Sequence, residues 1–334
     1  MKAATINASD LLTLVRKGVN ASTVHTEARK PFRFLLCGDP GLVAELRALL
    51  LLARDSDENI PLDAASTLET IDPERRPTVV GADARCVIFL GRGAADVAGA
   101  RLDLLQQLRL PVFALTVDAA ATPLAQPGAA PAAGEVAEYV VPRLDRESLR
   151  GRFFPQLIDR CKGVEVAVGR RLPALRETVA AKLTRDAASS ALKVAAASAV
   201  VESVPLLGIV IGAVASAGDI VAITGIQIVL MIQIGATYGK DPDVARIWEL
   251  LPVVGGGLGW RALSRELAGF IPVAGIAIKG AIAYAGTIVV GEGVSFFYEY
   301  GRHMTAQQAG QIYEEKKRAA LTFARTLASR IKKS

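Results

Sequence analysis

The stretch whose residue types could do chemistry is Gly38-Asp39-Pro40-Gly41. It follows the apolar run Phe32 to Cys37 and precedes a helical pattern that continues to about Ala53. A strand, a glycine turn and a helix form the usual setting of a phosphate site, because free backbone N–H groups and the helix dipole face the ligand there. The sequence therefore marks this turn as a candidate nucleotide-binding corner.

The turn departs from the P-loop pattern G-x-x-x-x-G-K-[ST] after its first glycine. Gly38 supplies that glycine, but Val43, Ala44 and Glu45 stand where Gly, Lys and Ser/Thr are required. Without the Lys the β- and γ-phosphates lose their counter-charge, and without Ser/Thr the Mg²⁺ loses an oxygen ligand. Glu45 also brings a negative charge close to the phosphates. The pattern disfavours Mg²⁺-nucleotide binding and favours a non-catalytic protein.

Two other interpretations of the same turn stay open. Gly38-x-x-Gly41-x-x-Ala44 is similar to a dinucleotide-binding turn, for which Asp55 or Asp57 would be the ribose ligand, although neither clearly ends a second strand. Alternatively, the chain needs glycine here only to make a tight turn. The candidate cofactor-binding residues are therefore Gly38, Asp39 and Gly41.

Other reactive side chains are scattered along the sequence. His25 and His303 are isolated, and Cys37, Cys86 and Cys161 form no CxxC or Cys/His spacing. This predicts reduced structural thiols and no metal site. A G-x-S-x-G nucleophile elbow is also missing from the sequence, so we expect no catalytic residues.

The elements that would position the turn alternate between strand and helix over residues 31–163. Strands are expected at Phe32 to Cys37, Cys86 to Leu90, Pro111 to Val117 and Tyr139 to Val141, with one or two short strands between Asp55 and Gly81. Helices are expected at Ala94 to Leu108 and Ser148 to Cys161, after a first helix at Asn7 to Val19 within residues 1–30. This alternation predicts an α/β domain with a parallel sheet covered on both faces.

The second half of the chain has a different composition. Helix is expected from Val164 to about Ser203, with a kink at Pro173, and Val194 to Gly239 then contains only two charged residues, Glu202 and Asp219. A second apolar stretch, Leu267 to Val290, has one charge, Lys279. These patterns predict an apolar helical domain over residues 164–303.

The two apolar stretches are related by an offset of 67 residues. Val204-Pro205-Leu206-Leu207-Gly208-Ile209 aligns with Ile271-Pro272-Val273-Ala274-Gly275-Ile276. Proline is tolerated in the first turn of a helix, so each Pro is expected to restart a helix after a short break. The repeat predicts two hairpin-like units, each entered through a kink.

The excess positive charge indicates a membrane location. Lys and Arg equal Asp and Glu up to Gly163, with 20 of each, whereas residues 164–334 have 19 basic and 13 acidic residues. Residues 304–334 are expected to form a basic C-terminal helix, which either contacts an anionic lipid surface or is simply solvated. Basic residues flank both apolar stretches on each side, so the positive-inside rule predicts cytoplasmic termini and an even number of crossings or re-entrant hairpins.

Residues from about Ala188 to Tyr300 resemble a bacterial family of unknown function. The resemblance rests on the two proline elements, on Gly218-Asp219-Ile220 before Gln227-Ile228, and on Gly256-x-x-Gly259 before Arg261-Ala262-Leu263. This family lies at the C-terminus of certain Era-like GTPases and in YcjF-type inner-membrane proteins. It implies that residues 31–163 are similar to a GTPase domain that has lost its motifs. Asp118 is what remains of an N-K-x-D motif, and Arg143-Leu144 replaces a Ser-Ala pair that would help to hold guanine.

The resulting hypothesis is a pseudo-GTPase at the cytoplasmic face of the inner membrane, acting as a scaffold or regulatory protein. Its expected partners are the lipid bilayer and a protein, which the resemblance suggests is a GTPase. Nucleic acid is not expected as a partner, and no cofactor is expected unless GTP binds in a nonstandard way. The alternatives are a divergent nucleotide-binding switch and a soluble helical-bundle interaction protein.

Overall fold

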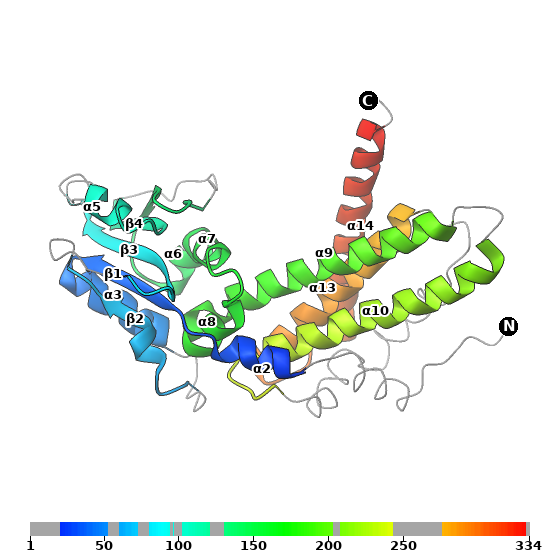
Figure 1. The fold of residues 1–334 in the computed structure, drawn as a ribbon, viewed down its shortest axis with the longest axis horizontal. Coiled ribbons are helices and arrows are strands. Elements are labelled where there is room, and N and C mark those ends of the chain that lie inside the picture. The colour runs from blue at the N-terminus through cyan, green and yellow to red at the C-terminus, as the bar shows by residue number, and fades with distance from the viewer. Residues whose placement is uncertain are drawn as a thin grey trace. The chain divides into compact units, whose positions relative to one another are not determined.

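The computed structural model describes residues 21–52, 60–72, 80–93, 96, 102–120, 130–202, 208–242 and 276–331 (Figure 1). The chain divides into two compact units. The α/β unit comprises Thr26–Val179 and Ala236–Lys240, and the helical unit comprises Met1–His25, Ala180–Gly235 and Asp241–Ser334. The helix expected at Asn7 to Val19 and most of that expected at Ala94 to Leu108 lie outside the described residues.

The α/β unit contains the expected parallel sheet. Its described strands are β1 (Arg33–Gly38), β2 (Leu68–Thr70), β3 (Ala84–Arg92), β4 (Val112–Val117) and β5 (Val136–Val141). All neighbours pair in parallel, in the order β2-β1-β3-β4-β5. The chain moves outward from β1 in one direction to β2 and in the other to β3. The switch point of this doubly wound sheet therefore lies between β1 and β3, where such sheets bind ligands.

Short helices surround the sheet in the described part of the α/β unit. They are α2 (Ala21–Arg29, which begins in the helical unit), α3 (Pro40–Leu51), η1 (Ala64–Thr67), α5 (Leu102–Gln106), α6 (Arg146–Arg150), α7 (Phe153–Asp159), α8 (Glu165–Arg171) and η2 (Pro173–Leu175). Leu105 of α5 packs with Val112 and Ala114 on one face of the sheet. Phe113 points to the opposite face, because side chains alternate along a strand, and there its ring meets Phe153 of α7 at 5.8 Å.

Two differences from the expected helices have local causes. Ser148 to Cys161 is divided into α6 and α7, because Pro155 has no N–H with which to bond the carbonyl of Gly151 in a continuous helix. The kink expected at Pro173 is present as the 3-10 turn η2.

The helical unit consists, in its described part, of long helices. They are α9 (Arg176–Glu202, whose first turn belongs to the α/β unit), α10 (Gly208–Thr237), α13 (Ile276–Tyr300) and α14 (Ala306–Ile331). The prolines at positions 205 and 272 lie outside the described residues, and α10 and α13 begin shortly after them.

Close contacts fix the directions of these helices. Along α13, Gly280 lies against Leu192 of α9, and further on Gly291 lies against Thr184, so α9 and α13 are antiparallel. Gln227 of α10 donates to the Thr287 hydroxyl at 3.3 Å, and a Cβ on Gly235 would lie 3.0 Å from the hydroxyl of Tyr298. Residue numbers rise together in these pairs, so α10 and α13 are parallel.

Candidate functional site

The Gly38 turn is much shorter than a phosphate loop. Strand β1 ends at Gly38 and α3 begins at Pro40, so Asp39 alone lies between them. Gly38 has a φ of +107°, and a Cβ at this position would lie 2.0 Å from the backbone oxygen of Leu90 in β3. Glycine is required here both by the backbone conformation and by the neighbouring strand. The geometry favours the tight-turn interpretation.

The N-terminus of α3 is occupied by the protein's own carboxylate. Asp39 is the N-cap, and its Oδ1 accepts a hydrogen bond from the backbone N–H of Leu42 at 2.8 Å. Pro40 at the first helical position has no N–H to offer. A phosphate placed here would compete with a covalently attached anion that already uses the first-turn donors.

Arg92, at the end of β3, completes this arrangement at the switch point. Its Nε donates to Asp39 Oδ2 at 3.1 Å, and its backbone N–H donates to Asp96 Oδ2 at 2.6 Å. The Arg92 guanidinium and the Leu42 N–H lower the pKa of Asp39, and Asp39, Glu45 and Asp96 together raise the pKa of Arg92. The cation nearest the turn is therefore matched by carboxylates of the chain itself.

The positions that a P-loop would use lie inside α3. Val43 is buried against the core, whereas Ala44 and Glu45 are exposed on the helix. Gly41 is the second residue of the helix, and its Cβ position would meet the Asp39 carboxylate at 3.1 Å. No loop separates Gly38 from the helix in which these residues lie, so backbone N–H groups cannot wrap around a phosphate chain.

Asp118 lies on the same edge of the sheet but apart from the Gly38 turn. It follows β4, and its Oδ1 accepts from the N–H of Ala120 at 2.9 Å. Strand β3 lies between β1 and β4, which places these two strands ~10 Å apart. Arg143 follows β5 and pairs with Asp145, and Leu144 is buried. The structure therefore distributes the sequence candidates along one edge instead of gathering them.

Sequence reasoning missed Arg92 and Asp96. Arg92 follows the buried run Cys86 to Leu90 by two residues, and charged residues directly after a buried parallel strand mark the ligand-binding edge of a sheet. That signal was present in the sequence. Asp55 and Asp57, the candidate ribose ligands, lie outside the described residues.

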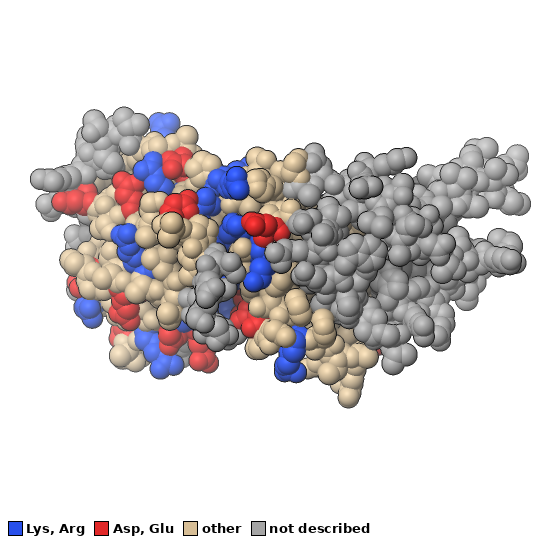
Figure 2. Space-filling view, turned by 90° about the horizontal axis from the view of Figure 1, so that it is seen from below, with Lys and Arg blue, Asp and Glu red and all other residues tan. Residues whose placement is uncertain are grey.

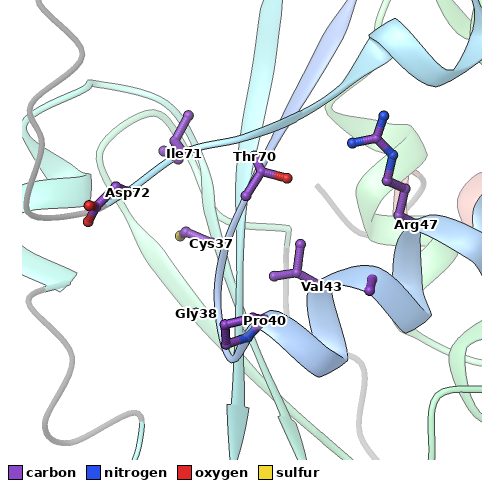
Figure 3. A pocket seen from close by; sticks show the side chains of 9 residues that line it. Cys37, Gly38, Pro40, Val43, Arg47, Thr70, Ile71 and Asp72 are labelled. Atoms are coloured by element: carbon purple, nitrogen blue, oxygen red, sulfur yellow. The ribbon is translucent and has the colours of Figure 1, made fainter.

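A hollow of about 440 Å³ lies beside the turn, between α3 and the end of β2 (Figure 3). Cys37 forms its floor, Val43 and Ile71 its walls, and Arg47 and Asp72 lie on opposite sides. Burial raises the pKa of Cys37 to about 12, so the thiol stays protonated and unreactive at neutral pH. Arg47 donates to the carbonyl of Ala65 at 3.1 Å. The hollow brings together no nucleophile and base.

Within the described ranges, no group of three or more His, Cys, Asp or Glu side chains could hold a metal ion. His303 stacks on Phe297 with ring centroids 5.1 Å apart. The thiols of Cys37, Cys86 and Cys161 are buried in the described structure.

In the helical unit, one described helix is long and apolar enough to cross a membrane, Gly280–Tyr300 of α13. Within its most apolar window, 67% of the residues are buried inside the unit, as they are in the core helix of a water-soluble protein. A shorter apolar segment is Ala222–Thr237 of α10. Length and composition alone therefore allow one span among the described helices.

The basic C-terminal helix α14 packs along α13. Lys316 bonds Glu315 at 2.8 Å and Lys317 pairs with Glu314 at 3.5 Å, so the two lysines are matched within the helix. Lys316 also interacts electrostatically with Glu292 and Tyr284 of α13. The charged part of α14 thus lies beside the very stretch of α13 that is long enough to cross a membrane.

Comparisons with known proteins give no relative. No protein-family model, curated protein or solved structure matches this chain.

Proposed function

We propose that this protein is a non-catalytic scaffold or regulatory protein, a pseudo-GTPase held at the cytoplasmic face of the inner membrane by its helical unit. The α/β unit recognises a protein partner, for which a GTPase is the first candidate. The observation that supports this proposal best is that the chain's own side chains fill the switch point, where Asp39 caps α3 and pairs with Arg92 at 3.1 Å.

The surface of the α/β unit also supports a protein partner over a polyanion. In Figure 2, Lys and Arg alternate with Asp and Glu over the described surface of this unit. Asp72, Asp39, Asp96 and Asp118 follow β2, β1, β3 and β4 at the carboxyl edge of the sheet. A nucleoside triphosphate would meet carboxylates along this edge, and repulsion between like charges opposes its binding.

Calorimetric titration of the full-length chain with Mg²⁺-GTP, Mg²⁺-GDP and Mg²⁺-ATP tests the non-catalytic assignment. We expect no heat of binding up to millimolar nucleotide. The alternative, a divergent nucleotide-binding switch, predicts a dissociation constant in the micromolar range. Such a result would replace the proposed function with that alternative.

Cell fractionation tests the membrane assignment separately. We expect the chain in the membrane pellet, resistant to a salt wash and released by detergent. Recovery in the soluble fraction alone would favour the remaining alternative, a soluble helical-bundle interaction protein. Pull-down from detergent extracts then identifies the partner.

A further inference from the structure

We infer that the distal part of the helical unit inserts into a single leaflet of an anionic phospholipid membrane, with Lys193 and Lys279 at the level of the headgroups. The distal part is defined as Val194 to Glu202 of α9, Gly208 to Gly218 of α10 and Ile276 to Ile278 of α13. This inference rests on the membrane attachment in the proposed function and specifies how the attachment is made.

The register of the helices places three charged positions at one level of the bundle. Leu192 lies against Gly280, so Lys193 and Lys279 are level on the antiparallel helices α9 and α13. Gln227 of α10 donates to Thr287 of α13, and the two helices are parallel. Eight residues earlier on each helix, Asp219 is therefore level with Lys279. Lys193 is exposed to solvent. We call this level the lysine level.

Beyond the lysine level α9, α10 and α13 carry almost no charge. The distal residues of α10 and α13 include no ionisable group, and those of α9 include only Glu202. Val194 to Glu202 is nine residues and Gly208 to Gly218 is eleven. At 1.5 Å per residue they extend ~13 to ~17 Å, about half of a ~30 Å hydrocarbon core. The length of helix without charged side chains therefore matches the hydrocarbon thickness of one leaflet.

On the other side of the lysine level, charged side chains of the unit are exposed to solvent. Glu314, Glu315 and Arg318 of α14 are exposed, and Lys316 of the same helix interacts with Glu292 and Tyr284. A crossing by Gly280–Tyr300 would carry these charged residues of α14 into hydrocarbon, where each is strongly disfavoured. The packing of α14 on α13 therefore excludes this crossing while the unit stays folded as described.

An anionic leaflet, as opposed to a neutral one, fits the lysine level, where two lysines outnumber the single carboxylate of Asp219. Lys side chains reach from an apolar stem to the headgroups, and each basic residue near an anionic surface strengthens binding about fivefold. Glu202 is the exception beyond this level, since a carboxylate in hydrocarbon opposes insertion. Replacing it by Gln should strengthen vesicle binding by roughly tenfold.

The test uses the full chain with vesicles of phosphatidylethanolamine and phosphatidylglycerol. An environment-sensitive fluorophore is attached to a cysteine at Val200 or, in a separate variant, at Ser295. The unsubstituted chain serves as the labelling control, because Cys37, Cys86 and Cys161 are buried. We expect the Val200 probe to be quenched by nitroxides in the lipid acyl chains, and the Ser295 probe by iodide in water.

Two results would overturn the placement of the distal part in the leaflet without contradicting membrane attachment itself. Quenching of the Ser295 probe by acyl-chain nitroxides would show that α13 crosses the membrane. Iodide quenching of both probes in vesicle-bound protein would show that another surface binds lipid. If the chain binds no vesicles, the membrane attachment in the proposed function fails as well. Protection of the Val200 probe without vesicles, together with a dimer in sedimentation, would identify a second copy as the occupant.

Substitution of the lysine level gives an independent measure. Lys193→Gln should weaken binding to anionic vesicles about fivefold and leave binding to neutral vesicles unchanged. Arg185→Gln is the matched control, because Arg185 is exposed on the same helix ~12 Å further from the distal part, about one and a half Debye lengths at physiological salt. Equal effects of the two substitutions would contradict headgroup contact at Lys193.

Discussion

The switch point of the α/β unit and the distal part of the helical unit differ in how their residue types relate to their surroundings. The Gly38 turn has the elements of a ligand site, yet Asp39 and Arg92 satisfy one another and the helix end. The distal part has almost no polar chemistry, and its charge-free length ends at a common level of lysines. A turn that is similar to a ligand-binding motif can thus be filled by the chain's own side chains, while an apolar segment without any motif is the basis of the proposed membrane attachment.

The largest expected effect concerns the requirement for glycine at the turn. Gly38→Val forces a β-branched residue to a φ of +107° and places its Cβ 2.0 Å from the Leu90 oxygen. We expect a loss of roughly 3 to 5 kcal/mol in the free energy of unfolding, measured by urea titration. Gly41→Ala is the control, because Gly41 has no positive φ and its Cβ would meet only side-chain atoms, the nearest being Asp39 Oδ1 at 3.1 Å. If both variants were equally stable, the turn would not require glycine at position 38.

The contact between α9 and α13 gives the next effect. A Cβ on Gly291 would lie 2.2 Å from the buried Thr184 hydroxyl oxygen of α9. Gly291→Ala should therefore lower the free energy of unfolding by about 1 to 3 kcal/mol. The variant Gly310→Ala, at an open position of α14, should instead be neutral or slightly stabilising. Adding Thr184→Ala to Gly291→Ala should recover part of the loss, and simple additivity would mean that α9 and α13 do not approach here.

The ion pair at the switch point predicts a smaller effect that depends on pH. The pKa of Asp39 is lowered by Arg92 and the Leu42 N–H, so its contribution to stability is present above the unfolded pKa, about 4. This contribution is lost as pH falls below that value, through the pKa in the folded state. Asp39→Asn keeps a capping oxygen but should remove this part of the acid sensitivity. Unfolding curves that keep the same pH dependence in both proteins would show that Asp39 is not paired.

The smallest effect is expected at the C-terminal helix. Lys317 is matched by Glu314 and lies over the ring of Tyr313, so Lys317→Gln should leave vesicle binding unchanged within a factor of two or so. Flotation at low and moderate salt measures this, with Lys193→Gln as the sensitive comparison. A larger loss for Lys317→Gln would move the lipid contact from the lysine level to α14.

Sequence reasoning reached the parallel sheet because buried strands and amphipathic helices have different periods. The β1 and β4 strands and α3 appear within about two residues of where the pattern placed them. It also identified Gly38, Asp39 and Gly41 as neighbours. It could not show that Asp39 is paired with Arg92, because that contact joins residues 53 apart in the sequence. The break between α6 and α7 follows from Pro155 and was within reach of the sequence.

In the helical unit, the sequence shows where the apolar stretches lie but not how the helices are aligned with one another. Its apolar stretches are obvious in the sequence, and the sequence arguments left an even number of crossings and re-entrant hairpins both open. The placement proposed above rests instead on the level of Lys193 and Lys279 and on the position of α14 beside α13. Both depend on register between helices, which composition and hydropathy do not contain.

The measurement that tests the central claim most directly is labelling of a single cysteine placed at Ser334, in intact cells. The background lacks Cys37, Cys86 and Cys161, and the reagent does not cross the inner membrane. A chain that is attached to the cytoplasmic face without passing through the membrane predicts modification of the cysteine only after the cells are permeabilised. Modification in intact cells would place the C-terminus outside and contradict the account.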